Sequence, residues 1–280
     1  MPTALLGLVS GLASAISFGA GDFSGGVASR RAGGMAVAAG AQVVGLVALL
    51  LGLLVLRPPA PESEALLLGI AAGVAGGLGL AALYAGMAIG AMGLVAALSG
   101  LGSVGIPVLV GAASGALLSP MQLVGVALAA LAAMTAAGAS RIGVSRTALL
   151  LAALAAVSFG SWFVLLDLAA DAGDPLWVLV VSRGTSAVLI GTVVAARRTG
   201  GGLRAVAPVV VLAGMLDVGG NVLFVVARGA IDVGLAAALS GLYPLVTMLL
   251  ARLVLGDALP RLGLVAVALA VAAVALISLG

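Results

Sequence analysis

Apolar runs long enough to cross a membrane occupy most of this 280-residue sequence. A helix of roughly 20 residues crosses the hydrocarbon core of a bilayer, which is about 30 Å thick. The runs are continuous and do not alternate between apolar and polar residues, so helices are expected and not the strands of a barrel. We therefore predict an all-α integral membrane protein with ten transmembrane helices, at residues 3–22, 35–56, 65–87, 92–115, 121–139, 147–167, 176–196, 207–228, 233–255 and 262–279.

The composition excludes most soluble classes of protein. Hydrophobic residue types make up 64% of the chain and charged types only 8%, whereas a soluble domain has about 25% charged residues. His, Cys and Lys are absent, which excludes imidazole metal sites, thiol chemistry and lysine Schiff bases. A chain without Lys also lacks the phosphate-binding Gly-x-x-x-x-Gly-Lys-Ser/Thr motif. We expect no metal and no cofactor, and no nucleic-acid partner.

The second half of the sequence repeats the first half at a single offset of 141 residues. Ser17-Phe18-Gly19 aligns with Ser158-Phe159-Gly160, and Leu94–Leu101 aligns with Leu235–Leu242 at seven identical positions of eight. We interpret this as a duplication into two five-helix repeats, residues 1–140 and 147–280. Because five is an odd number, the second repeat must be inverted relative to the first. Inverted repeats are a recurring architecture of membrane transporters.

A motif near the C-terminus resembles a known family. Leu239-Ser240-Gly241-Leu242-Tyr243-Pro244, followed by Ala251-Arg252 and Leu255-Gly256-Asp257, resembles the signature of EamA domains in the drug/metabolite transporter superfamily. That family usually has Glu where this chain has Asp257. Arg183 resembles the family's Arg in the second helix of a repeat, and Gln42 takes its place in the first repeat. The resemblance implies a bacterial transporter of ten helices.

Polar residues within an apolar span are costly in lipid, so each is a candidate for function. Asp217, Asn221, Phe224 and Arg228 are spaced i, i+4, i+7 and i+11, which places them on one helical face. Their offset partners Gly76, Leu80, Leu83 and Met87 carry no charge. We expect Asp217 and Asn221 to face a central pathway, where Asp217 holds an ammonium group or exchanges a proton. Alternatively, Asp217 forms a structural bridge with Arg183 or Arg228.

Three further charged residues have two interpretations each. Arg183 lies inside the seventh span, where it binds a substrate carboxylate or ties helices together, and its recurrence in the family favours the tie. Arg228 lies four residues before Asp232 at a helix end, so it forms an interfacial ion pair or binds a substrate carboxylate. Asp22 lies at the end of the first predicted span and either lines the pathway or sits at the membrane surface.

Aromatic residues are scarce, so their positions are informative. Trp162, Tyr84 and Tyr243 lie within predicted spans, where each ring stacks on a substrate or packs in the core. Ser99 and Ser240 occupy matching positions in the two repeats, each followed by Gly and, further on, by Pro. We expect locally irregular helices there, whose free backbone groups line a cavity. The predicted pathway residues are Asp22, Tyr84, Ser99, Trp162, Asp217, Asn221, Ser240 and Tyr243.

Arginines gather on one side of the predicted spans. The positive-inside rule places that side in the cytoplasm and both termini outside, whereas the family resemblance implies termini inside. The loops on the side that follows the first span contain Arg30, Arg31, Arg141, Arg146, Arg197, Arg198, Arg204 and Arg261.

Together these patterns predict a secondary transporter in a bacterial cytoplasmic membrane, as a monomer or homodimer. It would move a small, amino-acid-like metabolite by alternating access, in the export direction, driven by protons or by the substrate's own gradient. One alternative is a membrane-embedded enzyme, which needs paired acids or a nucleophile with a base at one depth. Another is a passive channel or structural membrane protein, which has no need of inverted halves.

Overall fold

The computed structural model describes residues 2–90, 92–113, 115, 119–139, 145–170, 172–231, 239–256 and 261–279. This described part contains ten α-helices, one short 3-10 helix and no strand. Seven α-helices are long and apolar enough to cross a membrane, and three shorter ones are also apolar. The predicted all-helical, multi-pass membrane fold is confirmed. The elements are α1 (Pro2–Ala32), α2 (Gly34–Leu56), α3 (Ser63–Ile89), α4 (Met92–Ala113), α5 (Pro120–Ala139), α6 (Arg146–Ala170), α7 (Pro175–Arg197), η2 (Leu203–Val206), α8 (Ala207–Ala230), α10 (Tyr243–Leu255) and α11 (Arg261–Leu279).

Two helices differ from the predicted spans. The first was predicted to end at residue 22, but α1 continues to Ala32 and ends before Gly33, whose φ is +81°. Asp22 therefore lies inside a helix and not at its end, because the flanking small residues let the helix continue past one carboxylate. The ninth predicted span, 233–255, is described only from residue 239, and residues 241–242 form a turn before α10 begins at Tyr243.

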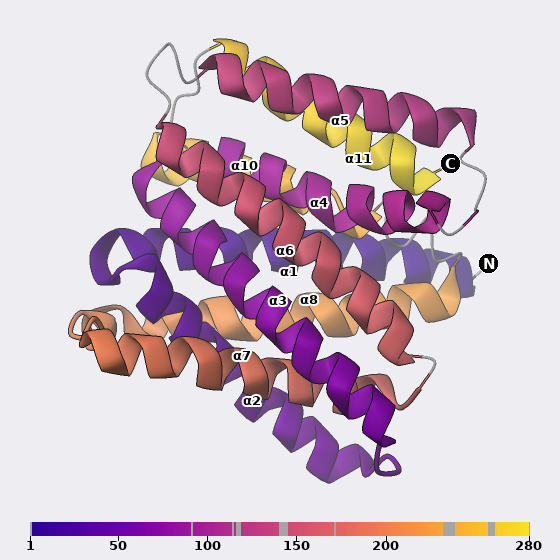
Figure 1. The fold of residues 1–280 in the computed structure, drawn as a ribbon, viewed down its shortest axis with the longest axis vertical. Helices are drawn as coiled ribbons and strands as arrows, with labels where there is room; N and C mark the ends of the chain where they lie inside the picture. Colours follow the sequence, from indigo (N-terminus) through magenta and orange to yellow (C-terminus); the bar gives the residue numbers. More distant parts are fainter. Residues whose placement is uncertain are drawn as a thin grey trace.

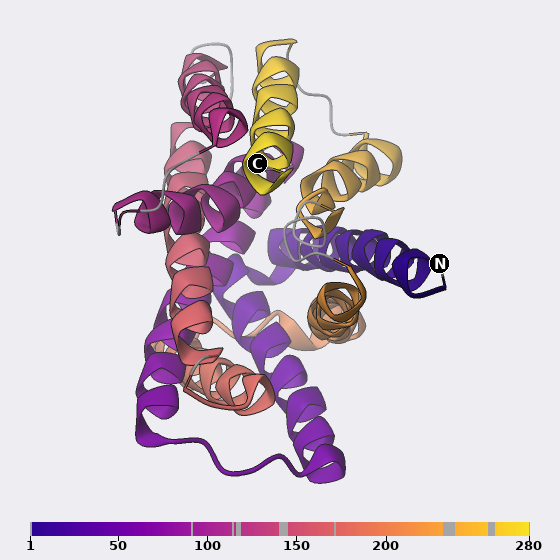
Figure 2. The ribbon, with the colours of Figure 1, turned by 90° about the vertical axis from the view of Figure 1, so that its right-hand side faces the viewer.

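Successive helices run in opposite directions across the bundle, so that the loops gather at its two edges (Figure 1). Both chain termini lie at the right-hand edge in Figure 1, as an even number of crossings requires. The first helices of the two predicted repeats, α1 and α6, run in opposite directions, which is the inversion expected from five helices per repeat. In Figure 2, α5 and α11 stand side by side at one end of the molecule.

Packing between helices follows the offset of 141 residues. The most extensive contacts join α1 to α8 and α3 to α6. The offset converts α1 into α6 and α3 into α8, so these two pairs are counterparts of each other. Extensive contacts also join α2 to α7 and α5 to α11, and each of these pairs joins a helix to its own counterpart.

Individual contacts repeat at the same offset. A Cβ atom added to Gly79 would lie 2.8 Å from the ring of Phe159, and one added to Gly220 would lie 2.6 Å from the ring of Phe18. The described residues with positive φ include two offset pairs: Arg57 with Arg198, which end α2 and α7, and Gly115 with Gly256. The duplication is thus visible in backbone conformation. The boundaries proposed for the repeats, 1–140 and 147–280, stay a prediction.

The largest buried cluster fills the side of the bundle opposite the chain termini. It joins the C-terminal ends of α1 and α3 to the N-terminal ends of α2 and α4, through residues that include Ala28, Val37, Leu83, Met87 and Val95. Many of its members are Ala. Small residues let helices approach closely, so that van der Waals packing holds them together in lipid.

Candidate functional site

A cavity of about 920 Å³ lies between the two halves of the chain. Its wall takes residues from α1, α2, α3 and α4 in the first half and from α6, α7, α8, α10 and α11 in the second. Pockets for small molecules are typically about 300–1,000 Å³. The cavity is therefore large enough to enclose a small metabolite.

The cavity reaches one surface of the helical layer and stops short of the other. Gly111, Leu168 and Pro175 line it, and they lie near the ends of α4, α6 and α7 on the side of the chain termini. At the other end of the cavity, Gln42 lies eight residues from the start of α2, and Gly100 lies eight residues from the start of α4. Eight residues span about 12 Å of helix. The large buried cluster closes that side.

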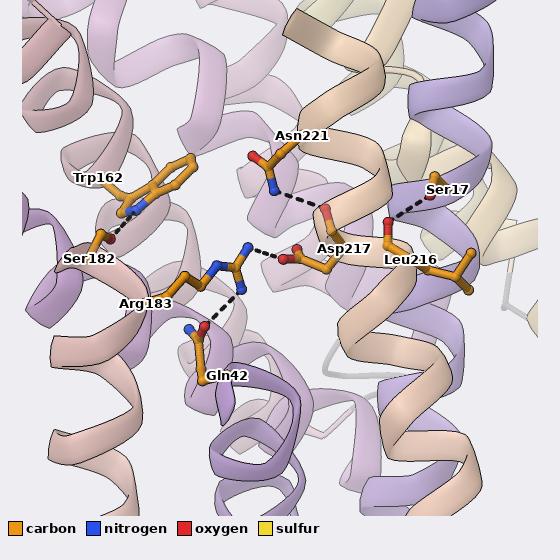
Figure 3. Close-up of polar contacts among 8 residues, drawn as sticks. All are labelled: Ser17, Gln42, Trp162, Ser182, Arg183, Leu216, Asp217 and Asn221. Atoms are coloured by element: carbon orange, nitrogen blue, oxygen red, sulfur yellow. Dashed lines mark hydrogen bonds and ion pairs between the residues drawn. The ribbon is translucent and has the colours of Figure 1, made fainter. Parts of the chain in front are cut away.

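Arg183 joins three helices at the wall of the cavity (Figure 3). From α7, its Nη1 donates a hydrogen bond to Oε1 of Gln42 on α2 at 2.7 Å, and its Nη2 donates to the carboxylate of Asp217 on α8. The Arg183 side chain is 9% exposed and that of Asp217 26%. Gln42 and Arg183 are 141 residues apart, so their hydrogen bond joins counterpart positions across the two halves. Both Nη groups of Arg183 are thus engaged within the protein.

The predicted polar face of α8 borders the cavity. Asp217, Asn221 and Phe224 all line it. Nδ2 of Asn221 donates to the main-chain oxygen of Asp217 at 2.8 Å, one turn earlier in the helix. On the other side of α8, Oγ of Ser17 donates to the main-chain oxygen of Leu216 at 2.6 Å, which holds α1 against α8 (Figure 3). The side chain of Arg228 and the whole of Asp232, expected to pair, lie outside the described residues.

Aromatic side chains concentrate at the cavity. Nε1 of Trp162 donates to Oγ of Ser182 at 3.1 Å, and its ring meets that of Phe163 edge-on with centroids 4.8 Å apart. Trp162 packs over Gly76, where an added Cβ would lie 2.8 Å from the ring. Gly76 is the offset counterpart of Asp217, so a glycine makes room for the indole where the other half carries the acid. Six of the nine aromatic residues line the cavity: Phe18, Phe159, Trp162, Phe163, Phe224 and Tyr243.

Ser240 and Tyr243 lie on either side of the turn at residues 241–242, and both line the cavity. The ring of Tyr243 meets that of Phe18 edge-on, with centroids 6.4 Å apart. Ser240 is 7% exposed, and its Oγ has no hydrogen-bond partner within the described part of the chain. A buried hydroxyl without a partner is unfavourable by about 1–3 kcal/mol. This hydroxyl is therefore available to a ligand.

Two residues expected on the pathway are buried elsewhere. Tyr84 is 1% exposed and packs over Gly25 of α1, within the large buried cluster. Ser99 is fully buried and donates to the main-chain oxygen of Val95 at 2.8 Å. Neither borders the cavity, although Ser240, the offset counterpart of Ser99, does. The two repeats hold the same residue in different surroundings, which the sequence pattern does not reveal.

The sequence analysis did not place Gln42, Ser182 or Ser103 among the pathway residues, yet all three line the cavity. Gln42 was noted only as the residue that replaces an Arg. Gln42 lies 141 residues before Arg183, and this spacing could have indicated their contact. Two positions that a two-fold axis exchanges between repeats can meet where the repeats touch.

Comparison with known proteins identifies the second half of the chain. Residues 146–279 match the family model of the EamA-like transporter family. No curated protein matches the sequence significantly. A solved structure described as "Crystal structure of protein" shares the fold with a TM-score of 0.62 and 18% sequence identity, over 95% of this chain and 97% of that chain. Residues 146–279 are therefore a domain of the EamA-like transporter family, whose members serve the transport of small molecules across membranes.

Proposed function

We propose that this protein is a secondary transporter that exports a small, amino-acid-like metabolite across a bacterial cytoplasmic membrane by alternating access. The transporter family of its second half supports membrane transport. The resemblance of its C-terminal motif to EamA exporters supports the direction and the substrate class. The driving force is the proton gradient or the substrate's own gradient.

One comparison between the halves carries the alternating-access part of this proposal. Leu83 and Tyr84 on α3 are each 1% exposed and belong to the cluster that closes one side. Their offset counterparts on α8 are Phe224 and Val225, which line the cavity on the other side. Equivalent positions are thus packed in one half and open in the other. If the two halves exchange conformations, Phe224 and Val225 pack, Leu83 and Tyr84 separate, and the cavity faces the opposite surface.

Counterflow in proteoliposomes tests this function. Vesicles containing the purified chain are loaded with an unlabelled mixture of amino acids and placed in a trace of the same mixture labelled with ¹⁴C. A carrier takes up the label transiently above equilibrium, and uptake saturates with concentration. Protein-free vesicles are the control. Uptake that never exceeds equilibrium and does not saturate would indicate a channel, and labelled reaction products would indicate an enzyme.

A further inference from the structure

The charges at the cavity wall do not balance. Among the described residues, the charged side chains that border the cavity are Asp22, Arg183 and Asp217. Arg183 and Asp217 form an ion pair, and the other Nη group of Arg183 is bound to Gln42. No hydrogen bond or ion pair from the described part of the chain reaches the carboxylate of Asp22. The carboxyl group of Asp22 therefore lines the cavity without a partner of opposite charge in the described part of the chain.

Asp22 lies toward the closed end of the cavity. It follows Phe18 by one turn of α1, so both side chains line the cavity from the same helical face. Asp22 and Asp217 lie on facing segments of α1 and α8, since a Cβ added to the neighbouring Gly21 would lie 3.4 Å from the main-chain nitrogen of Asp217. Charges interact strongly where the surroundings are poorly polarisable. A cation bound beside Asp22 pairs with the carboxylate and favours its ionised form.

A second group at this end of the cavity also lacks a partner. The hydroxyl of Ser240 is buried and has no hydrogen bond to the described residues, and the same segment places Tyr243 beside Phe18. The ring of Tyr243 meets that of Phe18, which lies one turn before Asp22 on α1, so these groups share one region. An ammonium group has three N–H donors, which the oxygens of Asp22 and Ser240 can accept. Aromatic rings further stabilise a cation held near their faces.

We propose that Asp22, with the Ser240 hydroxyl and the rings of Phe18 and Tyr243, binds the ammonium head of the substrate, and that the cavity selects ligands of net charge +1. This deepens the proposed function by naming the charge class of the metabolite: an amino acid amide, a decarboxylated amine or a basic amino acid. A zwitterion also brings a carboxylate. Arg183 is not free to pair with it, because Gln42 and Asp217 already accept hydrogen bonds from its two Nη groups.

Equilibrium binding of three ligands that share one side chain tests this inference. Phenylalaninamide, phenylalanine and N-acetylphenylalanine carry charges of +1, 0 and −1 at about pH 6.5, below the pKa of an α-amino group, which is about 7.7–8.0. Their affinities for the purified chain in nanodiscs are measured by calorimetry. We expect phenylalaninamide to bind at least about tenfold more tightly than phenylalanine, and N-acetylphenylalanine to bind most weakly.

Variants assign the selectivity to Asp22. In Asp22→Asn the amide and the free amino acid should bind within about twofold of each other, whereas Asp22→Glu keeps the preference. Glu64→Gln removes an acid that is exposed at the start of α3, so it should bind like the wild type. Ser240→Ala should weaken binding of the amide severalfold, which keeps the test valid if Asp22→Asn does not fold.

Three results would overturn the inference: phenylalanine binding as tightly as its amide, none of the three ligands binding, or the preference persisting in Asp22→Asn. Failure of the proposed function gives a different result. Charge-selective binding without counterflow would reject transport and leave the cation site standing. Counterflow without any charge preference would support transport and reject the cation site.

Discussion

Arg183 shows how a single side chain keeps a charge within a membrane-spanning bundle. A charge at this depth is costly unless it is paired or hydrated. Here the guanidinium binds a carboxylate on α8 and an amide on α2, and therefore ties three helices together. The bond to Gln42 joins counterpart positions of the two halves. Two arginines at these positions would repel each other, whereas Gln accepts a hydrogen bond from Arg.

Replacing one partner of this tie should destabilise the fold more than replacing both. Asp217→Asn leaves Arg183 without its counter-ion, and we expect a loss of about 1.5–3 kcal/mol in stability, the range for hydrogen bonds to charged groups. Arg183→Leu with Asp217→Leu should lose less than the sum of the single changes, because no charge is left unpaired. Thermal unfolding in detergent measures the cycle. Additive effects of the two changes would contradict the pairing.

At the scale of helices, the two repeats have diverged at one matched position. The sequence predicts an irregular helix in both repeats, after Ser99 and after Ser240. A turn interrupts the chain at residues 241–242, but α4 passes through residues 99 and 100 without a break. Pro244 lies in the first turn of α10, where its missing N–H and fixed φ favour a helix start. Its counterpart is Ser103, which carries no such preference.

Glycines at helix crossings should tolerate substitution only where there is space. A Cβ added to Gly73 of α3 would lie 2.5 Å from the main-chain oxygen of Ser182, whereas one added to Gly191 of α7 would meet nothing within 4 Å. We expect Gly73→Ala to destabilise the protein by about 1–3 kcal/mol, because the helices must separate. Gly191→Ala, the matched control, should be neutral or slightly stabilising. Equal melting temperatures for the two variants would contradict this packing.

For the molecule as a whole, hydropathy was sufficient to predict an all-helical membrane fold of ten helices. The sequence also singled out Asp217, Asn221 and Trp162, which line the cavity, because polar and large aromatic groups stand out among Ala and Leu. The sequence did not reveal that Tyr84 and Ser99 are buried away from the cavity, because Ser99 and its counterpart Ser240 are the same residue in different surroundings. The extent of α1 was misjudged, since a carboxylate facing a cavity resembles one at the membrane surface.

Membrane orientation follows from the same architecture. Described arginines near the edge opposite the termini include Arg31, Arg197 and Arg204. The positive-inside rule predicts that this edge faces the cytoplasm. The chain has no Cys, so single cysteines can report topology. In intact cells, a membrane-impermeant maleimide should label Pro59→Cys, between α2 and α3, and spare Arg204→Cys until the cells are permeabilised. Labelling of Arg204→Cys alone in intact cells would place the termini inside.

Paired accessibility of Phe224→Cys and Leu83→Cys tests alternating access most directly. Each variant is reconstituted in vesicles and exposed to an impermeant maleimide from either side, at rest and during counterflow. We predict that Phe224→Cys is labelled from the cavity side at rest and that Leu83→Cys is protected. During counterflow, labelling of Phe224→Cys should fall, and Leu83→Cys should become reactive from the opposite side. Leu83→Cys remaining protected while transport proceeds would contradict the exchange of conformations between the two repeats.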